Sequence, residues 1–66
     1  MDFSTLFKTQ WKQMRGKVKE KWGNLTDDDL DKVDGQFDQL VGLLEEKYEL
    51  TRAKAEAEIT QFFTKK

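Results

Sequence analysis

The chain has no cysteine, no histidine and no proline among its 66 residues. Without cysteine and histidine it cannot form a disulfide, a thiolate nucleophile, an imidazole acid–base group or a zinc site of the usual ligand types. A secreted domain of this length usually needs disulfides, so the lack of cysteine favours a cytoplasmic protein. Long apolar runs are also missing, and nothing in the sequence resembles a signal peptide or a membrane span.

Charged residues make up 38% of the chain and apolar residues 36%, and eight residues are aromatic. This mixture indicates a small helical bundle rather than a disordered chain, because the aromatic side chains give the protein a core to bury. A chain this short supports one domain with a thin core, so we expect a single all-α domain over residues 1–66, and a monomer. A thin core leaves little room for a pocket that raises the pKa of a carboxylate, so we expect neither an enzyme nor a cofactor.

A first helix is predicted over about residues 4–22, because apolar residues recur there at steps of three and four. Gly16 falls outside this apolar stripe, and a glycine can bend a helix or divide it in two, but we expect a single helix here. The apolar stripe consists of Phe3, Phe7, Trp11, Met14, Val18, Trp22 and Leu25.

Three shorter helices are predicted over about residues 27–33, 36–48 and 52–64 from apolar residues at helical spacing. Asp34-Gly35 indicates a break between the first two of them. The side chains expected to face inward are Leu30 and Val33, then Phe37, Leu40, Val41, Leu44 and Tyr48 with Leu43 beside them, and finally Ala55, Ile59 and Phe62 with Phe63 beside them.

The segment from Trp22 to Leu30 ends the first helix and begins the second. Gly23 or Asn24 is expected to adopt the left-handed conformation that often ends a helix. Thr26 is then the N-cap of the next helix, and Asp29, three residues on, is the other half of a capping box. The segment therefore predicts a sharp corner between two helices, and it carries no group with recognisable catalytic chemistry.

The chain also contains an internal repeat, because residues 11–22 align with residues 37–48. Each half, over about residues 4–33 and 36–64, consists of a longer helix, a Leu-Thr corner and a shorter helix. One such hairpin cannot bury both of its faces. We therefore expect two crossed α-hairpins packed against each other, with four helices, or five if the first helix breaks near Gly16.

The net charge is only −1, but the charges are segregated along the chain. Residues 1–25 carry +4 and residues 26–38 carry −5, while the remainder is balanced. We expect the basic first helix and the acidic corner to attract each other, although exposed ion pairs stabilise a protein by only about 0–1 kcal/mol each.

One side of the first helix carries a basic stripe, which consists of Lys8, Lys12, Arg15 and Lys19. Phosphate contacts need clustered lysine and arginine, so this stripe is the candidate nucleic-acid site. The acidic pI of about 5.3 speaks against such a site. A solvated flank that the acidic corner partly neutralises is the more frequent explanation of such a stripe.

Two other kinds of site are considered and not favoured. Asp27, Asp29 and Asp31 occupy the first, third and fifth positions of an EF-hand loop, but Lys32 stands where that loop needs glycine, so we expect no metal site. The first helix taken alone has the pattern of a helix that lies on an anionic membrane, but its two tryptophans are more often core residues in so small a chain.

Three strings of the sequence are distinctive: Trp11-Lys12-Gln13, Gly16-Lys17-Val18-Lys19-Glu20-Lys21-Trp22-Gly23 and Leu25-Thr26-Asp27-Asp28-Asp29-Leu30. Together with Asp38-Gln39-Leu40-Val41-Gly42 and the following Tyr48, they resemble the CsbD-like family, and the resemblance covers about residues 8–60. It implies two crossed α-hairpins of the SAM-domain-like kind, and it brings no catalytic residues. Thr9 and Glu49 stand where the family usually has glycine.

Members of this family are small bacterial proteins linked to the general stress response, and their molecular activity is not established. The resemblance therefore implies a non-catalytic stress-response protein, and we expect it to act by protein contacts or by abundance. The alternative is a helical domain that binds nucleic acid through the basic stripe.

Overall fold

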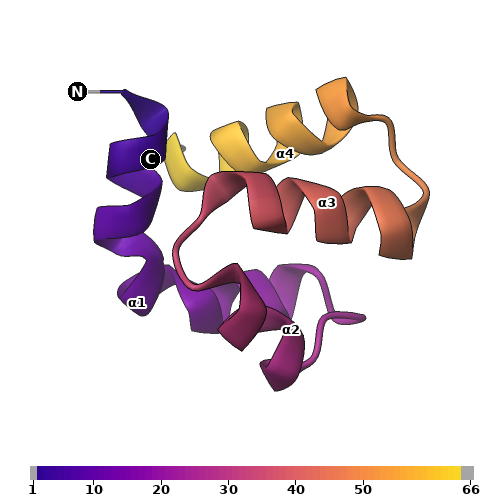
Figure 1. Ribbon diagram of the computed structural model, residues 1–66, viewed down its shortest axis with the longest axis horizontal. Coiled ribbons are helices and arrows are strands. Elements are labelled where there is room, and N and C mark those ends of the chain that lie inside the picture. The colour runs from indigo at the N-terminus through magenta and orange to yellow at the C-terminus, as the bar shows by residue number, and fades with distance from the viewer. Residues whose placement is uncertain (1, 65–66) are drawn as a thin grey trace.

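The computed structural model describes residues 2–64, and over these residues it contains α-helices and no strand. The helices are α1 (Phe3–Lys21), α2 (Asp27–Val33), α3 (Phe37–Tyr48) and α4 (Arg52–Thr64). Figure 1 shows α3 and α4 side by side, with α2 on the other side of α3. The prediction of an all-α fold with four helices is confirmed. The SAM-domain-like arrangement and the origin of the fold in a duplicated hairpin stay predictions.

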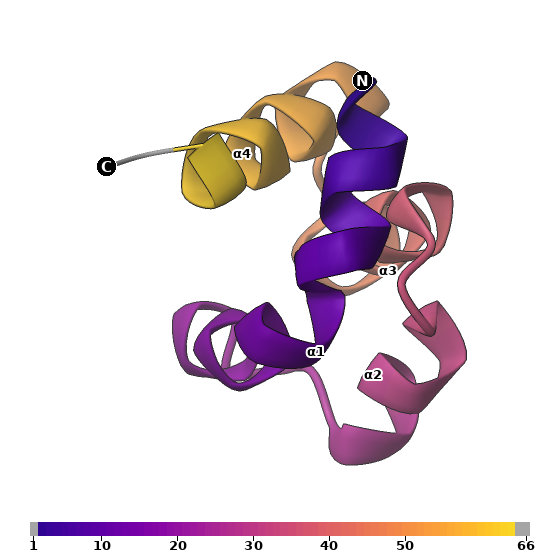
Figure 2. The same cartoon turned by 90° about the vertical axis from the view of Figure 1, so that its left-hand side faces the viewer.

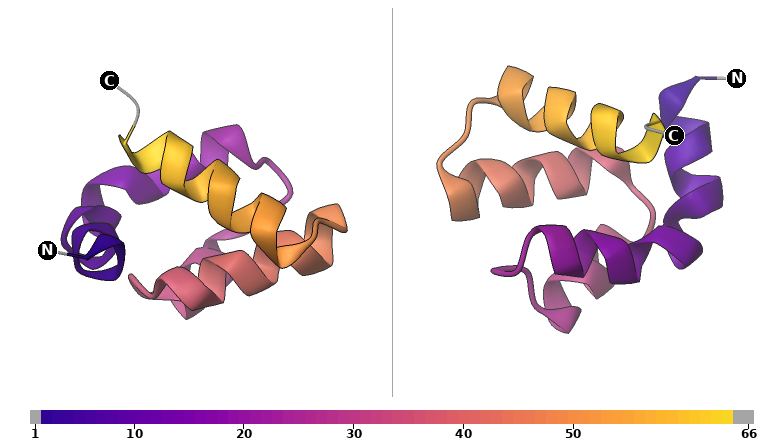
Figure 3. Two further views of the ribbon diagram at one scale, coloured as in Figure 1. Left: turned by 90° about the horizontal axis from the view of Figure 1, so that it is seen from above. Right: turned by 180° about the vertical axis from the view of Figure 1, so that it is seen from behind.

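The first helix is continuous and changes direction partway along (Figures 1 and 2). The left view of Figure 3 looks along its first half, while its second half runs across the view. Gly16 is exposed, and a Cβ atom placed there would meet nothing within 4 Å, so packing does not require a glycine at this position. The helix assignment runs unbroken from Phe3 to Lys21, so the first helix is not divided at Gly16.

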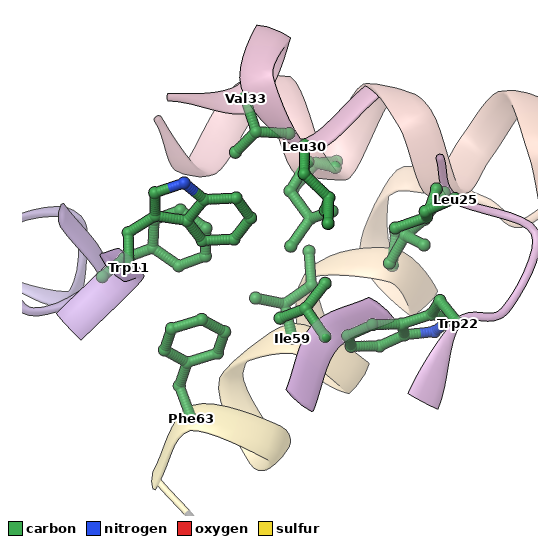
Figure 4. Close-up of a cluster of buried hydrophobic side chains, with 13 residues drawn as sticks. Trp11, Trp22, Leu25, Leu30, Val33, Ile59 and Phe63 are labelled. Atoms are coloured by element: carbon green, nitrogen blue, oxygen red, sulfur yellow. The ribbon is translucent and has the colours of Figure 1, made fainter. Parts of the chain in front are cut away.

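The bend lets both halves of α1 contribute to a single core. Trp11 is 6% exposed and Trp22 is 4% exposed, so both tryptophans are core residues as predicted. Figure 4 shows Trp11 and Phe63 at one end of this core and Trp22 and Leu25 at the other, with Ile59 between them. The buried apolar residues are Phe7, Trp11, Val18, Trp22, Leu25, Leu30, Val33, Leu40, Val41, Leu44, Ala55, Ile59 and Phe63.

One inward-facing residue of α4 was predicted wrongly. Phe63 is buried, whereas Phe62 is only half-buried and packs edge-on against Trp22 with 5.3 Å between ring centroids. Steps of three and of four residues both keep side chains on one helix face, so Ile59 is compatible with either phenylalanine. In the structure the buried residue is Phe63, four residues after Ile59, and Phe62 lies at the edge of the core beside α1.

The corner between α1 and α2 begins the second helix as predicted but ends the first helix differently. Thr26 caps α2, and its hydroxyl oxygen accepts from the Asp29 N–H at 3.1 Å in a complete capping box. Neither Gly23 nor Asn24 has a positive φ, so the expectation of a left-handed residue here is wrong. The turn is instead closed by the Leu25 N–H, which donates to the carbonyl of Trp22 at 3.0 Å.

Left-handed residues occur at the other two helix ends. Asp34 and Gly35 have φ values of 46° and 76° and form the predicted break between α2 and α3. Glu49 ends α3 with a φ of 54°, a conformation that costs a residue with a Cβ atom roughly 1 kcal/mol relative to glycine.

Glu49→Gly should therefore raise the free energy of unfolding by about 0.5–1 kcal/mol, because glycine adopts this conformation without the Cβ clash. Urea denaturation followed by circular dichroism measures the change. Glu46→Gly is the matched control, since Glu46 is an exposed residue inside α3 where glycine should destabilise the helix by about 1 kcal/mol. Equal effects of the two substitutions would contradict the left-handed assignment.

Candidate functional site

Two of the four residues of the basic stripe form ion pairs with aspartates of α2. Arg15 lies 2.9 Å from an Asp31 carboxylate oxygen, and the Lys19 ammonium lies 2.8 Å from Asp27. The hydrogen bond from Lys19 also lowers the pKa of Asp27 below its usual value. The predicted attraction between the basic helix and the acidic corner is thereby confirmed.

The other two residues of the stripe, Lys8 and Lys12, are exposed on the first half of α1 and form no ion pair within residues 2–64. The stripe is therefore divided. One half faces the carboxylates of α2, and only the other half offers its charge to an external anion.

A group of polar residues, which we call the corner clamp, ties the α1–α2 corner to the end of α3. Asp29 accepts from the Thr26 N–H at 3.0 Å and forms an ion pair with Lys47 at 2.8 Å. Lys47 also donates to the Asn24 carbonyl at 3.4 Å, and the Tyr48 hydroxyl accepts from the Asn24 N–H at 3.1 Å. Five residues from two separate segments thus satisfy one another's polar groups.

The electrostatics of the corner clamp keep Asp29 ionised. The hydrogen bond from Lys47, followed by the one from the Thr26 N–H, lowers the pKa of Asp29 to about 2. A carboxylate that is so weakly basic, and that already accepts from the Thr26 N–H and pairs with Lys47, is unsuited to take a proton from a substrate. The corner clamp is therefore a structural element rather than a site of acid–base chemistry.

The three aspartates at the EF-hand positions form ion pairs with three different basic side chains. Asp27 meets Lys19, Asp29 meets Lys47, and Asp31 meets Arg15. Across residues 2–64 no three acidic side chains gather in a way that could hold a metal ion.

A hollow lies at the surface between the second half of α1 and α4. It has a volume of about 610 Å³ and is lined by Lys21, Lys54, Glu58, Gln61 and Phe62. A neighbouring hollow of about 360 Å³ shares two of these residues and extends past Lys17 and Glu20. We call the two together the α1–α4 groove.

The floor of the α1–α4 groove is aromatic and its edges are charged. Phe62 lines the groove and packs edge-on against the buried Trp22, and the Lys21 ammonium lies 5.3 Å from the Trp22 ring centroid and 5.8 Å from that of Phe62. A cation over an aromatic face is attracted to the ring, so Lys21 partly covers the floor. The arrangement suits the binding of an apolar side chain that is flanked by carboxylates.

Sequence reasoning missed this groove because it placed Phe62 in the core. The Phe62-Phe63 pair was the available signal, since two adjacent residues of a helix point about 100° apart and therefore do not face a neighbouring helix equally. Neither residue alone indicates which of them lies at the surface.

None of the helices in the described chain combines the length and the apolar character needed to cross a membrane. The four helices therefore contain no candidate membrane span.

Comparison with known proteins assigns the chain to a family. The model of the family described as CsbD-like matches residues 7–57. The UPF0337 protein PA4738 of Pseudomonas aeruginosa is 49% identical over 59 residues, which cover 89% of this chain and 91% of that protein. The UPF0337 protein YjbJ of Escherichia coli K12 is 49% identical over 55 residues, which cover 83% of this chain and 80% of that protein.

A third relative is longer. The UPF0337 protein NE2439 of Nitrosomonas europaea is 48% identical over 52 residues, which cover 79% of this chain and 55% of that protein. The comparison with solved structures gave no significant match. The family match spans all four helices, from the first half of α1 into α4, and the chain therefore belongs to the CsbD-like family.

Proposed function

We propose that this protein is a non-catalytic, cytoplasmic stress-response protein that acts through protein contacts. Membership of the CsbD-like family supports the stress-response part, since that family is linked to the general stress response. The α1–α4 groove is the single observation that supports the part about contacts. It places a half-exposed aromatic side chain between charged residues on the outside of the bundle.

The charges of the groove favour an acidic segment of a partner protein as its occupant. Three lysines line it, Lys17, Lys21 and Lys54, against two glutamates. Carboxylates of a bound segment would meet the lysines, while an apolar side chain of that segment covers Phe62. Aromatic residues that become covered at an interface often contribute a large share of the binding free energy.

Nucleic-acid binding is the alternative function, and its support lies on the first half of α1. Lys8 and Lys12 are the two residues of the basic stripe that α2 does not engage. Two lysines make few phosphate contacts, so the geometry favours the protein partner over this alternative.

A photo-crosslinking amino acid placed in a stressed bacterial host that expresses this protein tests both functions. In place of Gln61, which lines the groove, it should form a discrete adduct with a protein, and mass spectrometry should locate the crosslink in an acidic segment. In place of Lys12, it should form adducts with nucleic acid only if the alternative is correct. The adduct at Gln61 should weaken when Phe62→Ala is introduced.

Glu46 is the matched control position, because it is exposed on α3 and does not line the groove. Equal adducts from Gln61 and Glu46, or none from Gln61, would contradict the proposed contact site. An adduct with nucleic acid from Lys12 alone would replace the proposed function by the alternative.

A further inference from the structure

Charges of both signs line the α1–α4 groove, and none of them is used to hold the two helices together. The ion pairs within residues 2–64 join α1 to α2, α2 to α3 and α3 to α4, or lie within α4, and none joins α1 to α4. The charged residues of the groove, which take part in none of these pairs, are Lys17, Glu20, Lys21, Lys54 and Glu58. Ion pairs within the described chain therefore do not neutralise the groove.

Lys21 and Phe62 lie where the two hollows of the groove meet. Both line both hollows, whereas Lys17 lines only the smaller hollow and Lys54 only the larger one. Lys21 directs its ammonium at aromatic rings instead of at a carboxylate, 5.3 Å from the ring centroid of Trp22 and 5.8 Å from that of Phe62. In the free protein the centre of the groove is thus covered by a cation that has exchanged a carboxylate partner for two rings.

A partner that covers the Phe62 ring must displace the Lys21 ammonium, which loses its attraction to the rings. A partner side chain that is only apolar gives the ammonium nothing in return and removes part of its water. A carboxylate next to that apolar side chain offers the ammonium a charged hydrogen-bond acceptor in place of the rings. The groove therefore disfavours neutral partners through the contact that they break without replacing it.

We propose that Lys21 is the specificity-determining residue of the α1–α4 groove, and that it selects a partner segment in which a carboxylate stands next to the apolar side chain. This inference rests on the proposed function, because it takes the groove to be the contact site for a protein. The ammonium covers Phe62 in the free chain and passes to the partner carboxylate in the complex. Each hollow also contains one glutamate, which disfavours consecutive acidic residues in the partner. The partner carboxylates are therefore spaced along the groove, one of them beside the apolar side chain.

A random-peptide display library, selected against the full chain, supplies the probe. The selected peptides should share an apolar residue with an adjacent aspartate or glutamate, and an NMR titration should locate their binding at the second half of α1 and at α4. Replacing that acidic residue by its amide should weaken binding to the natural chain by roughly fivefold to thirtyfold, and binding to Lys21→Met by less than about twofold. Methionine keeps a long apolar side chain and removes the charge. Isothermal titration calorimetry measures the dissociation constants.

Lys17→Met is the matched control, because it removes the same charge one helical turn away, from a residue that lines only the smaller hollow. It should keep the sensitivity of the natural chain to the amide substitution. The inference is wrong, although the groove remains the contact site, if Lys21→Met keeps this sensitivity or if both variants lose it equally. Peptides that bind away from the groove, or a selection that yields no binding peptide, would contradict the proposed contact site as well.

Discussion

Phe7→Ala should leave most of the protein unfolded at 25 °C. Phe7 is completely buried, and its ring contacts those of Trp11, Phe37 and Phe63, with centroid distances of 5.2, 5.8 and 4.6 Å. Truncating a buried phenylalanine to alanine typically costs about 3–5 kcal/mol. A chain of this length rarely has more than about 3–5 kcal/mol of stability from its core, so the loss is comparable to the whole.

Far-ultraviolet circular dichroism, with and without urea, measures the folded fraction. Phe62→Ala is the matched control, because it removes the same side chain from the edge of the core, where the ring is only half-buried. It should cost about 1–2 kcal/mol and leave a cooperative transition, since less apolar area is uncovered. If the two variants unfold at the same urea concentration, Phe7 does not occupy the centre of the core.

Asp29→Ala is expected to have the second largest effect, through the corner clamp. It removes both the carboxylate that caps the Thr26 N–H and the ion-pair partner of the half-buried Lys47. Thr26→Ala removes only the hydroxyl half of the capping box and should cost about 1 kcal/mol. Urea denaturation at neutral pH should therefore show a larger loss for Asp29→Ala than for Thr26→Ala.

The dependence of the unfolding free energy on acid pH distinguishes the contribution of the Asp29 charge from that of the shape of its side chain. Folding lowers the pKa of this carboxyl from 3.8 to about 2, so its contribution is fully present above about pH 4 and is lost as the pH falls through 2. Asp2 and Asp27 also have lowered pKa values, so the natural chain should lose stability in acid for more than one reason.

Asp29→Asn is the variant for this test, because it keeps the shape of the side chain without the charge. Its unfolding free energy should vary less between pH 4 and pH 2 than that of the natural chain. Parallel pH profiles of the two proteins would show that the ion pair with Lys47 does not stabilise the fold.

Local interactions made several parts of the fold predictable. The capping box of Thr26 and Asp29 joins residues only three apart, and the Lys54 N–H donates to the Thr51 hydroxyl in the same way at the start of α4. The left-handed break at Gly35 follows from the freedom of a residue without a Cβ atom. Features of this kind depend on neighbours in sequence, and the chain therefore predicts them without knowledge of its packing.

The corner after α1 shows where such reasoning fails. Its sequence suited a left-handed end at Gly23 or Asn24, but the Tyr48 hydroxyl accepts the Asn24 N–H and Lys47 donates to the Asn24 carbonyl. These two partners come from the end of α3, more than twenty residues away. Local propensity cannot anticipate a hydrogen bond to a residue that only the fold brings close.

By itself the sequence determined the all-α class, the four helices, the Thr26 cap and the burial of the two tryptophans, because periodicity and capping act over three or four residues. Only the tertiary structure decided that α1 bends, that Phe63 rather than Phe62 enters the core, and that Arg15 and Lys19 face α2. Each of these outcomes depends on which helix lies opposite, and packing between distant segments sets that choice.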